Sequence, residues 1–362
     1  MNHNISSWCA GRFAIEAFVL ASLVVVTPSL AGAATGQLSV WGIKRWDQEY
    51  ASPGFVQLAC GGGFAVGVRA SGAVVCWGLN DALQCRPPAS LGPVATVDAG
   101  TAHAVALLRD GSVVCWGASD GGRTAVPAGL SQVVAVAAGS QHTLALRADG
   151  VVIAWGAGNA ALVPAGLSPA RAIDACGLAS GALLADGGVR CWGNSLVVPS
   201  DLPAAASIAC GGGHMLALLP DGSVRAWGSG SEATVPSDIG VTAAVYASRG
   251  VSAVLRTDGS VRTWGDWSGA LGAGPASLPP ATSLAIGGTD YLGSSTLLSI
   301  DPAGVVHACG AFAARLLGTS QDLGVVRQAS VQNDHGVAID DSGRIRTWGT
   351  DLYGEGVPPA FG

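Results

Sequence analysis

The sequence predicts an all-β protein that folds as a single β-propeller of short four-stranded blades. The dipeptide Trp-Gly recurs along the chain, a two-residue turn recurs in step with it, and short segments rich in Val, Ile and Leu lie between them. A period of about 40 residues with several strands in each unit is typical of a propeller. No window combines the period of an amphipathic helix with capping residues, which argues against a helical solenoid.

The segment 132–156 shows the repeating unit in its clearest form. Three apolar segments, VVAVAAG, HTLALR and VVIAWG, are joined by GSQ and by ADG. Their length and their content of β-branched residues favour strands over helices. The pair Asp149-Gly150 suits a tight hairpin turn that needs positive φ, and the same turn recurs at Ser71-Gly72, Asp110-Gly111, Asp186-Gly187, Asp221-Gly222, Asp258-Gly259, Ala303-Gly304 and Ser342-Gly343.

Trp-Gly ends each unit and therefore defines the register of the repeat. The tryptophans of these pairs are Trp41, Trp77, Trp116, Trp155, Trp192, Trp227, Trp264 and Trp348, and Cys309-Gly310 occupies the equivalent place between the last two. Eight complete units lie between Phe55 and Pro358, and an additional Trp-Gly strand at residues 38–42 precedes them. We therefore favour eight blades, with seven as the alternative.

A short fourth strand is expected after most units, because a Val-Pro pair follows Trp-Gly at a regular distance. Proline suits an edge strand, since it withholds a hydrogen-bond donor from the ladder and so discourages pairing between sheets. The pairs are Val126-Pro127, Val163-Pro164, Val198-Pro199, Val235-Pro236 and Val357-Pro358.

Taken together, these motifs resemble the regulator of chromosome condensation repeat family. The resemblance rests on the core AAGSQHTLALRADGVVIAWG and the following Val-Pro, covers residues 36–362, and is nearest to the compact branch that includes beta-lactamase inhibitor protein II. It implies a propeller, which in this family typically has seven blades. It says little about function, because proteins that share a fold bind unrelated partners.

The first 33 residues differ from the rest and predict a secretory signal peptide. Arg12 precedes the apolar run AFVLASLVVV, and the small residues Ala31-Gly32-Ala33 follow it. The run is shorter than the ~20 residues that span a bilayer. We expect cleavage before Ala34, a secreted or periplasmic protein, and a propeller domain over residues 34–362.

Charge argues against nucleic-acid binding. The formal net charge is −6, and Lys44 is the only lysine. Binding to phosphate backbones depends on Lys and Arg contacts, which such a chain cannot supply as a basic face. We expect a monomer without a cofactor that binds a protein partner, and no membrane contact once the signal peptide is removed.

Eight cysteines remain after Cys9, and two interpretations stay open. In the repeat register Cys60, Cys176 and Cys210 align with Ala99, Ala138 and Ala247, and Cys76, Cys115 and Cys191 align with Ala154, Ala226 and Thr263. This alternation favours small buried thiols. An exported protein also permits disulfides, and the preferred pairs are Cys60 with Cys76 and Cys176 with Cys191, although first and third strands of one blade lie far apart. No Cys-x-x-Cys spacing indicates a zinc site.

Histidine recurs at one repeat position, as His103, His142, His214 and His335, while Phe64, Ser180 and Val251 hold it in other units. Residues that recur once per blade are separated by the ring and cannot converge on one metal. We expect each imidazole to bond to neighbouring backbone. The turn aspartates have a similar structural explanation. No nucleophile elbow or phosphate-binding loop is present, so the sequence gives no support for an enzyme.

Aromatic residues are distributed unevenly among the loops that follow Trp-Gly. Five consecutive loops, after Trp77 through Trp227, have none, whereas aromatic residues occur in the first and last loops and in one long first-turn loop. First and last blades are neighbours in a closed ring, so these residues are predicted to form one interface, with packing at ring closure as the alternative. The predicted partner-binding residues are Arg45, Trp46, Tyr50, Trp267, Tyr291, Phe312 and Tyr353, near Lys44 and Arg315.

The resulting hypothesis is an exported, non-catalytic propeller that presents a loop face to a protein partner. Inhibition of a β-lactamase is a narrower version, implied only by the family resemblance. The alternatives are a structural or surface protein and an enzyme that uses the central channel. A channel lined by Ala, Val and Gly would argue against the enzyme.

Overall fold

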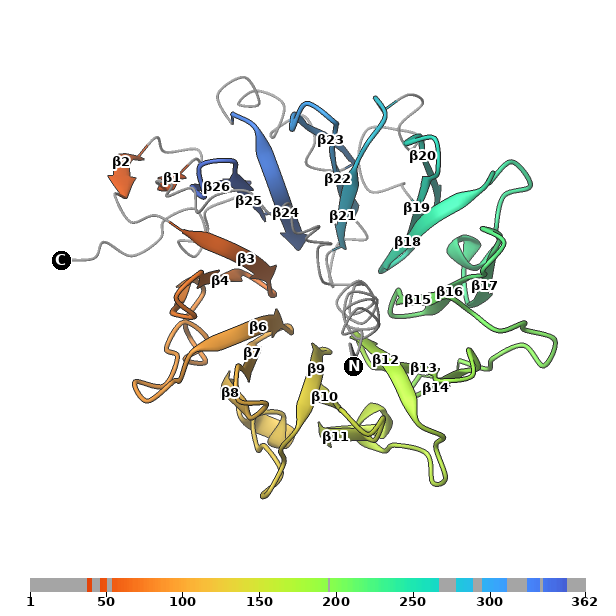
Figure 1. The fold of residues 1–362 in the computed structure, drawn as a ribbon, viewed down its shortest axis with the longest axis horizontal. Coiled ribbons are helices and arrows are strands. Elements are labelled where there is room, and N and C mark those ends of the chain that lie inside the picture. Colours follow the sequence, from red (N-terminus) through yellow and green to blue (C-terminus); the bar gives the residue numbers. More distant parts are fainter. Residues whose placement is uncertain are drawn as a thin grey trace, which may run out of the picture.

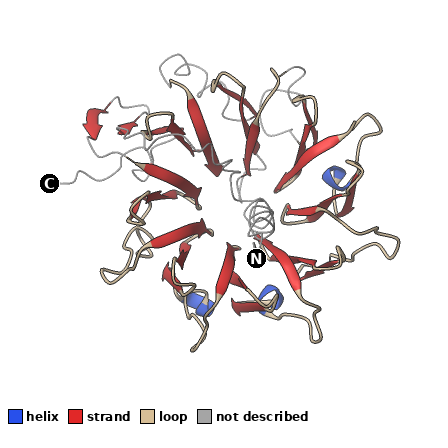
Figure 2. Cartoon of the chain, in the orientation of Figure 1, coloured by secondary structure: helices blue, strands red, loops and turns tan. Residues whose placement is uncertain are grey.

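The computed structural model describes residues 38–40, 46–50, 54–194, 196–266, 278–288, 295–310, 324–332 and 335–349. The described residues form eight sheets, which radiate from a central axis (Figure 1). Within the described ranges, helix is limited to three short 3-10 turns (Figure 2). No helix in the described ranges is long and apolar enough to cross a membrane. The predicted all-β class and propeller architecture are confirmed, and the proposed signal peptide at 1–33 lies outside the described residues.

Seven of the sheets have three strands and the eighth has five. We call the three-stranded unit of each sheet a blade and number the blades in chain order. The strands are β3 (Phe55–Cys60), β4 (Phe64–Arg69) and β5 (Val74–Gly78) in blade 1; β6 (Val94–Ala99), β7 (His103–Leu108) and β8 (Val113–Gly117) in blade 2; β9 (Val133–Ala138), β10 (His142–Arg147) and β11 (Val152–Gly156) in blade 3; and β12 (Ala170–Cys176), β13 (Ala179–Leu184) and β14 (Val189–Trp192) in blade 4.

The second half of the ring repeats the same order. Its strands are β15 (Ser207–Cys210), β16 (His214–Leu218) and β17 (Val224–Gly228) in blade 5; β18 (Thr242–Ser248), β19 (Val251–Arg256) and β20 (Val261–Gly265) in blade 6; β21 (Ser283–Gly288), β22 (Ser295–Ile300) and β23 (Val306–Gly310) in blade 7; and β24 (Val326–Gln332), β25 (His335–Asp340) and β26 (Ile345–Gly349) in blade 8. The 3-10 turns η1 (Asp120–Gly122), η2 (Asn159–Ala161) and η3 (Ser231–Ala233) follow blades 2, 3 and 5.

Blade 3 shows how the sequence produces each blade. Its strands pair antiparallel, with Leu144 opposite Ala137 on one side and Ala154 on the other. The predicted Asp149-Gly150 turn joins β10 to β11, and Gly150 has a φ of 83°, a conformation that glycine adopts without steric cost. The first strand of each blade lies nearest the axis (Figure 1).

The predicted fourth strand is wrong for the described units. The Val-Pro pairs at Val126, Val163, Val198 and Val235 lie in segments without strand structure. Proline has no N–H to donate to a ladder, and the following residues instead close turns, as when Leu130 N donates to Pro127 O. The valines pack against the core between blades. The pair Val357-Pro358 lies outside the described residues.

The buried apolar side chains of the described residues form eight clusters, each shared by two consecutive blades. One cluster joins Leu144 of blade 3 to Ile173 of blade 4, and both side chains are fully buried. Another joins Phe55 and Leu58 of blade 1 to Ile339 of blade 8 and so closes the ring. Full burial of such a side chain is worth about 1.5–3 kcal/mol, so the contacts between blades are a major source of stability.

Backbone hydrogen bonds join the blades at the end of the ring where the hairpin turns lie. Val133 N, which opens blade 3, donates to the turn residue Gly111 O of blade 2 at 3.0 Å. Ala148 N of blade 3 then donates to Gln132 O at 2.8 Å. The first of these bonds recurs at every junction from blade 1 to blade 8, with donors Val94, Ala170, Ala205, Thr242, Ala281 and Val326. The turn that shapes each hairpin therefore also positions the next blade.

Two strands from the N-terminal part of the chain extend the sheet of blade 8. The strand β1 (Leu38–Val40) pairs parallel with β26, and β2 (Trp46–Tyr50) pairs antiparallel with β1. The beginning of the described chain therefore lies beside its last blade, as the ring model requires.

Candidate functional site

The predicted aromatic interface lies largely outside the described residues. Of its members, Trp46 and Tyr50 begin and end β2, the outermost strand of the five-stranded sheet. The remaining members, Arg45, Trp267, Tyr291, Phe312 and Tyr353, lie outside the described residues, as do Lys44 and Arg315. The prediction of a single patch stays a prediction.

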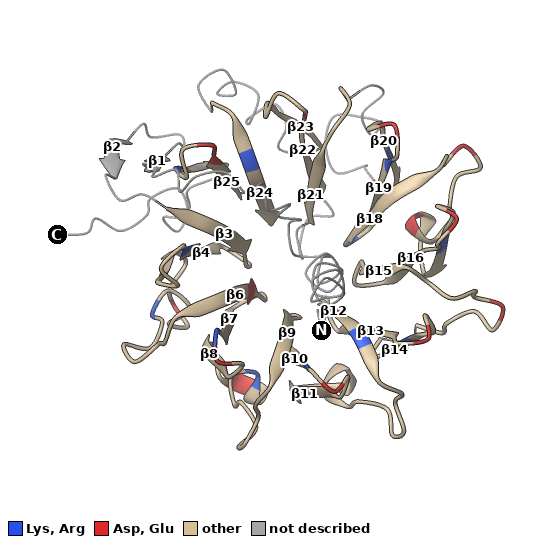
Figure 3. Cartoon of the chain, viewed as in Figure 1, with Lys and Arg blue, Asp and Glu red and all other residues tan. Residues whose placement is uncertain are grey.

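The described residues enclose a central cavity of about 760 Å³ at the end of the ring where the first and second strands are joined. Every blade contributes to its wall, mostly through glycine, alanine and other small residues. The expected lining of Ala, Val and Gly is thus only part of the wall, because Glu232, Arg249 and Asp266 also line it. Charged residues are otherwise sparse on the innermost strands (Figure 3).

The recurrent histidines join consecutive blades through a hydroxyl group. His103 Nε2 lies 3.0 Å from Thr143 Oγ1, His142 Nε2 lies 2.9 Å from Ser180 Oγ, and His214 Nε2 lies 2.8 Å from Ser252 Oγ. In each case the hydroxyl donates its proton to a backbone carbonyl, that of Arg123, Ala160 or Glu232 respectively. The hydroxyl has no second proton, so the imidazole must donate through Nε2–H.

These imidazoles are buried and uncharged at neutral pH. Burial lowers the pKa of His103 to about 3 and the pKa of His142 and of His214 to about 4. Each ring lies over a glycine, since a Cβ at Gly100, Gly139 or Gly211 would collide with it. His335 is buried at the same repeat position. The expected structural role holds. Three of the imidazoles bond to a side-chain hydroxyl of the next blade, and a backbone hydrogen bond with Ala179 raises the pKa of His142 against the larger effect of burial.

Two of these carbonyl groups, those of Ala160 and Glu232, accept a second hydrogen bond from the indole of the next blade, and Gln84 O, which follows blade 1, also accepts such a bond. Trp192 Nε1 donates to Ala160 O and Trp264 Nε1 donates to Glu232 O, both at 2.8 Å, and Trp116 Nε1 donates to Gln84 O at 2.9 Å. We call Gln84, Arg123, Ala160 and Glu232 the latch residues. They follow the Trp-Gly of blades 1, 2, 3 and 5 and hold the next blade through the main chain.

At the junction of blades 1 and 2 both partners are replaced at once. In blade 1 the histidine position is held by Phe64, and the facing position in blade 2 is held by Ala104, which has no hydroxyl. Both residues are fully buried in one cluster. A histidine without a hydroxyl would leave a buried donor unpaired, whereas Phe and Ala leave none.

Three residues at the junction of blades 5 and 6 have the composition of a hydrolase triad. Ser252 Oγ is bonded to His214 Nε2, and His214 Nδ1 lies 4.0 Å from Glu232 Oε1. However, Ser252 is fully buried and its proton is directed to Glu232 O. The equivalent junctions carry Arg123 and Ala160 in place of Glu232, so a carboxylate is not needed for this contact. The arrangement therefore gives no accessible nucleophile.

The turn aspartates behave as expected. The Oδ1 atom of Asp110, Asp149, Asp186, Asp221 or Asp258 accepts the N–H of the residue two positions later. Hydrogen bonds from Ser112 lower the pKa of Asp110, and Asp221 and Asp258 show the same effect from Ser223 and Ser260. These carboxylates stabilise the turns.

Sequence reasoning missed two buried carboxyl groups, Asp98 and Asp174. Asp98 accepts Ala99 N and, from the next blade, Ala138 N; Asp174 accepts Ala175 N and Cys210 N of the next blade, all at 2.8 Å. Burial raises the pKa of Asp98 to about 7 and that of Asp174 to about 8 despite these bonds. The sequence feature that indicates these two groups is an acidic residue within an apolar strand, as in VATVDA and ARAIDAC.

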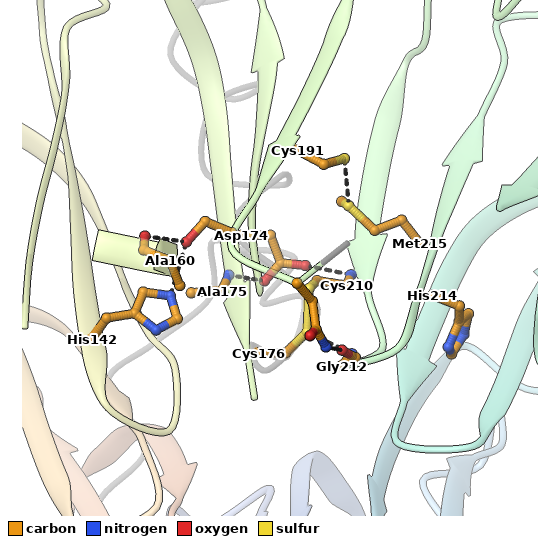
Figure 4. The surroundings of a disulfide bond; sticks show 12 residues. His142, Ala160, Asp174, Ala175, Cys176, Cys191, Cys210, Gly212, His214 and Met215 are labelled. Carbon is orange, nitrogen blue, oxygen red and sulfur yellow. Dashed lines mark hydrogen bonds between the residues drawn. A yellow bond between two sulfur atoms is a disulfide. The ribbon is translucent and has the colours of Figure 1, made fainter. Parts of the chain in front are cut away.

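The structure corrects the predicted disulfides. Cys176 is bonded to Cys210 of the next blade, with Cα atoms 5.8 Å apart (Figure 4). Cys60, Cys76 and Cys191 are free thiols. The predicted pairs join the first and third strands of one blade, which the second strand separates by two strand spacings of about 4.8 Å, beyond disulfide reach. First strands of adjacent blades, by contrast, come together near the axis.

The register in blade 4 also differs from the predicted alignment by one residue. Ala175 pairs with Ser180 as Ala138 pairs with Thr143, so Ala175 rather than Cys176 matches Cys60 and Cys210. Ala179 therefore holds the histidine position, and Ser180 holds that of Thr143. Cys176 stands where Gly139 lies beneath His142 in blade 3. A side chain fits there because blade 4 has no imidazole above it.

The free cysteines have no chemistry suited to catalysis or metal binding. Burial raises the pKa of the Cys60, Cys115 and Cys191 thiols to about 12. A thiol with so high a pKa is a poor nucleophile. Within the described part of the chain, no group of three or more His, Cys, Asp or Glu side chains could hold a metal ion.

Comparison with known families identifies the repeat. The model of the regulator of chromosome condensation (RCC1) repeat matches residues 55–84, 94–123, 133–160 and 205–232. The chain carries RCC1 repeats. Each matched segment begins at or just before the first strand of a blade and ends at its latch residue, so the repeat includes the carbonyl that holds the next blade. No curated protein matches the sequence.

Solved propellers show limited similarity to this RCC1-repeat chain. The CRINKLY WD40 ectodomain of the Arabidopsis thaliana receptor kinase ACR4 is 24% identical over 62% of this chain and 83% of its own, with a TM-score of 0.49. Human WBSCR16 is 20% identical over 69% and 85%, with a TM-score of 0.49. Prp20p from Saccharomyces cerevisiae is 18% identical over 99% and 90%, with a TM-score of 0.43.

Proposed function

We propose that this protein is an exported, monomeric, non-catalytic binding module that holds a protein partner on a loop face of its propeller. The observation that carries the proposal is the pairing of β1 with β26. It brings the first loop-bearing segment, with Trp46 and Tyr50, beside the last blade. Aromatic and arginine side chains are the usual anchors of protein interfaces.

The buried polar groups of the blades support a non-catalytic role. The histidines bond across blade junctions, the turn aspartates stabilise hairpins, and the apparent triad is closed to solvent. Each of these groups already has a structural role that accounts for its position. Binding would then depend on the loops that depart from the repeat. Export follows from the sequence of residues 1–33 and belongs to the same proposal.

Affinity capture with residues 34–362 tests the proposal, using an extract of exported proteins that includes β-lactamases. A double variant, Trp46→Ala with Trp267→Ala, is compared with a matched control, Leu162→Ala with Val197→Ala. The control residues are 67% and 80% exposed on loops without aromatic residues. Melting curves establish that both variants fold.

The expected result is a partner held by the parent and the control and lost by the aromatic variant. Recovery of a β-lactamase would support the narrower function of inhibition. Capture that is equal in all three proteins, or absent in all, would contradict the proposal and favour a structural protein.

A further inference from the structure

The junction between blades 4 and 5 is held differently from the junctions on either side of it. At both of those a histidine bonds to a hydroxyl of the next blade. Here Ala179 holds the histidine position and Met215 holds the hydroxyl position, and both side chains are buried in one apolar cluster. A covalent bond between Cys176 and Cys210 joins the two blades instead (Figure 4). The link between these blades therefore depends on the oxidation state of two sulfur atoms.

Hydrogen bonds between the two blades surround the disulfide. Cys210 N donates to Asp174 Oδ2, Gly212 N donates to Cys176 Sγ, and Asn194 Nδ2 donates to Gly212 O, each at 2.8 Å. Two of these bonds are made by the disulfide residues themselves. Without the S–S bond, this end of the junction would depend on such bonds and on apolar packing.

The disulfide lies in the wall of the central cavity, to which both cysteines contribute. Cys176 is partly exposed, whereas Cys210 is only 1% exposed. Glycines leave room beside Cys176. A Cβ built on Gly212 would meet nothing within 4 Å, and one built on Gly177 would meet only Gly212 Cα, at 3.5 Å, chain neighbours aside. Because exchange depends on access to the attacked sulfur, Cys176 Sγ is the favoured target of a small thiol in the cavity.

We propose that Cys176 is a thiol-exchange site and that the junction of blades 4 and 5 is a redox-sensitive switch. A small thiolate attacks Cys176 Sγ and forms a mixed disulfide, while the bond to Cys210 breaks and Cys210 leaves as a thiolate that takes up a proton. A second thiolate attacks the sulfur of the bound thiol and releases Cys176 as a thiolate, which accepts the N–H of Gly212 before it too is protonated. Two small thiols are thereby oxidised to one disulfide, and the protein disulfide is reduced. The proposal is independent of the proposed protein interface.

The first test follows reduction of the folded, oxidised protein by 2-mercaptoethanol in the absence of denaturant. Samples are quenched with acid, free thiols are alkylated, and peptides are mapped by mass spectrometry. The mixed disulfide should form on Cys176, with Cys210 recovered in alkylated form. The rate should rise with thiol concentration and exceed the rate of global unfolding, obtained from urea kinetics, by at least about tenfold. A mixed disulfide mainly on Cys210, or reduction no faster than unfolding, would overturn the exchange site.

The second test compares hydrogen exchange in the oxidised and reduced protein. Cys210 N and Ala138 N each donate to a buried aspartate of the preceding blade, but only the junction at Cys210 has a disulfide. Reduction should accelerate exchange at Cys210 N and Gly212 N by at least about tenfold more than at Ala138 N. Equal acceleration at all three amides, or none, would overturn the local switch.

Two variants serve as controls for both tests. Cys60→Ala removes a free thiol from the same cavity wall and should respond to 2-mercaptoethanol as the parent does. The double variant Cys176→Ala with Cys210→Ala should show the rapid local exchange of the reduced parent, whether or not thiol is present. Loss of the response in Cys60→Ala would assign the exchange to Cys60 and overturn the proposal.

Discussion

His142 and Ser180 belong to different blades, yet His142 Nε2 lies 2.9 Å from Ser180 Oγ, and both side chains are fully buried. The serine also donates to Ala160 O at 2.9 Å. A buried imidazole, a hydroxyl and a main-chain carbonyl therefore form one chain of hydrogen bonds across the junction. This arrangement recurs at two other junctions.

Ser180→Ala should lower the unfolding free energy by about 1–3 kcal/mol, because it leaves the His142 donor buried without a partner. The double variant His142→Phe with Ser180→Ala reproduces the Phe64 and Ala104 junction and should recover part of this loss. Urea denaturation provides the measurement, with Ser131→Ala, a change at an exposed residue, as a control that changes little. A double variant whose loss of stability equals the sum of the losses of His142→Phe and Ser180→Ala would show that the two residues act independently.

The tryptophans offer a matched pair of substitutions. Trp192→Phe removes the bond to Ala160 O, whereas Trp155 Nε1 is buried without a hydrogen-bond partner. Both tryptophans are 7% exposed, so the loss of buried area is comparable. Trp192→Phe should therefore be less stable than Trp155→Phe by about 1 kcal/mol in thermal or urea unfolding. Equal stability of the two variants would mean that the indole bond contributes nothing.

The buried carboxyls predict a pH dependence of stability. In the folded protein the pKa of Asp98 is about 7 and that of Asp174 is about 8. Both are higher than the pKa of ~3.9 that an aspartate has in an unfolded chain. Between pH ~4 and pH ~8 the folded state therefore binds more protons than the unfolded state. The two carboxyl groups contribute their full stabilisation below pH ~4, and this stabilisation is lost as the pH rises toward 7–8.

The measurement compares the parent with Asp98→Ala and Asp174→Ala in urea at pH 5, 6, 7 and 8. Alanine is the residue of other blades at this position, as in Ala137 and Ala209. The stability of the parent relative to each variant should fall with increasing pH, by at most about 1.4 kcal/mol per pH unit. A constant difference would show that the carboxyls do not change protonation on unfolding.

Reduction of the disulfide should destabilise the fold. Cys176 and Cys210 are 34 residues apart, and closing a loop of that length stabilises a protein by about 3–4 kcal/mol in the chain-entropy model. Dithiothreitol should lower the urea midpoint of the parent and leave that of Cys210→Ala unchanged. Cys115→Ala, which alters a free thiol, should retain the response of the parent. A response that persists in Cys210→Ala would assign the effect to another cause.

The sequence was sufficient to predict the strands and hairpin turns, because strand composition and turn chemistry are local properties. It was insufficient for contacts between blades. The alignment placed Ser180 with the histidines, whereas the ladder shows that it accepts a hydrogen bond from His142. Latch residues could not be found from side-chain patterns, since their shared function belongs to a backbone carbonyl. Cys176 and Cys210 became a plausible pair only when adjacent first strands were seen to converge.

The main-chain character of the latch has a consequence for protein engineering. Because Ser252 and Trp264 recognise only the carbonyl oxygen of Glu232, the identity of the side chain there is decoupled from assembly of the ring. Amide, guanidinium, methyl and carboxylate groups already occupy this position in different blades. Randomising Glu232, which lines the central cavity, would therefore give a library whose members keep one scaffold while the chemistry of the cavity wall is varied.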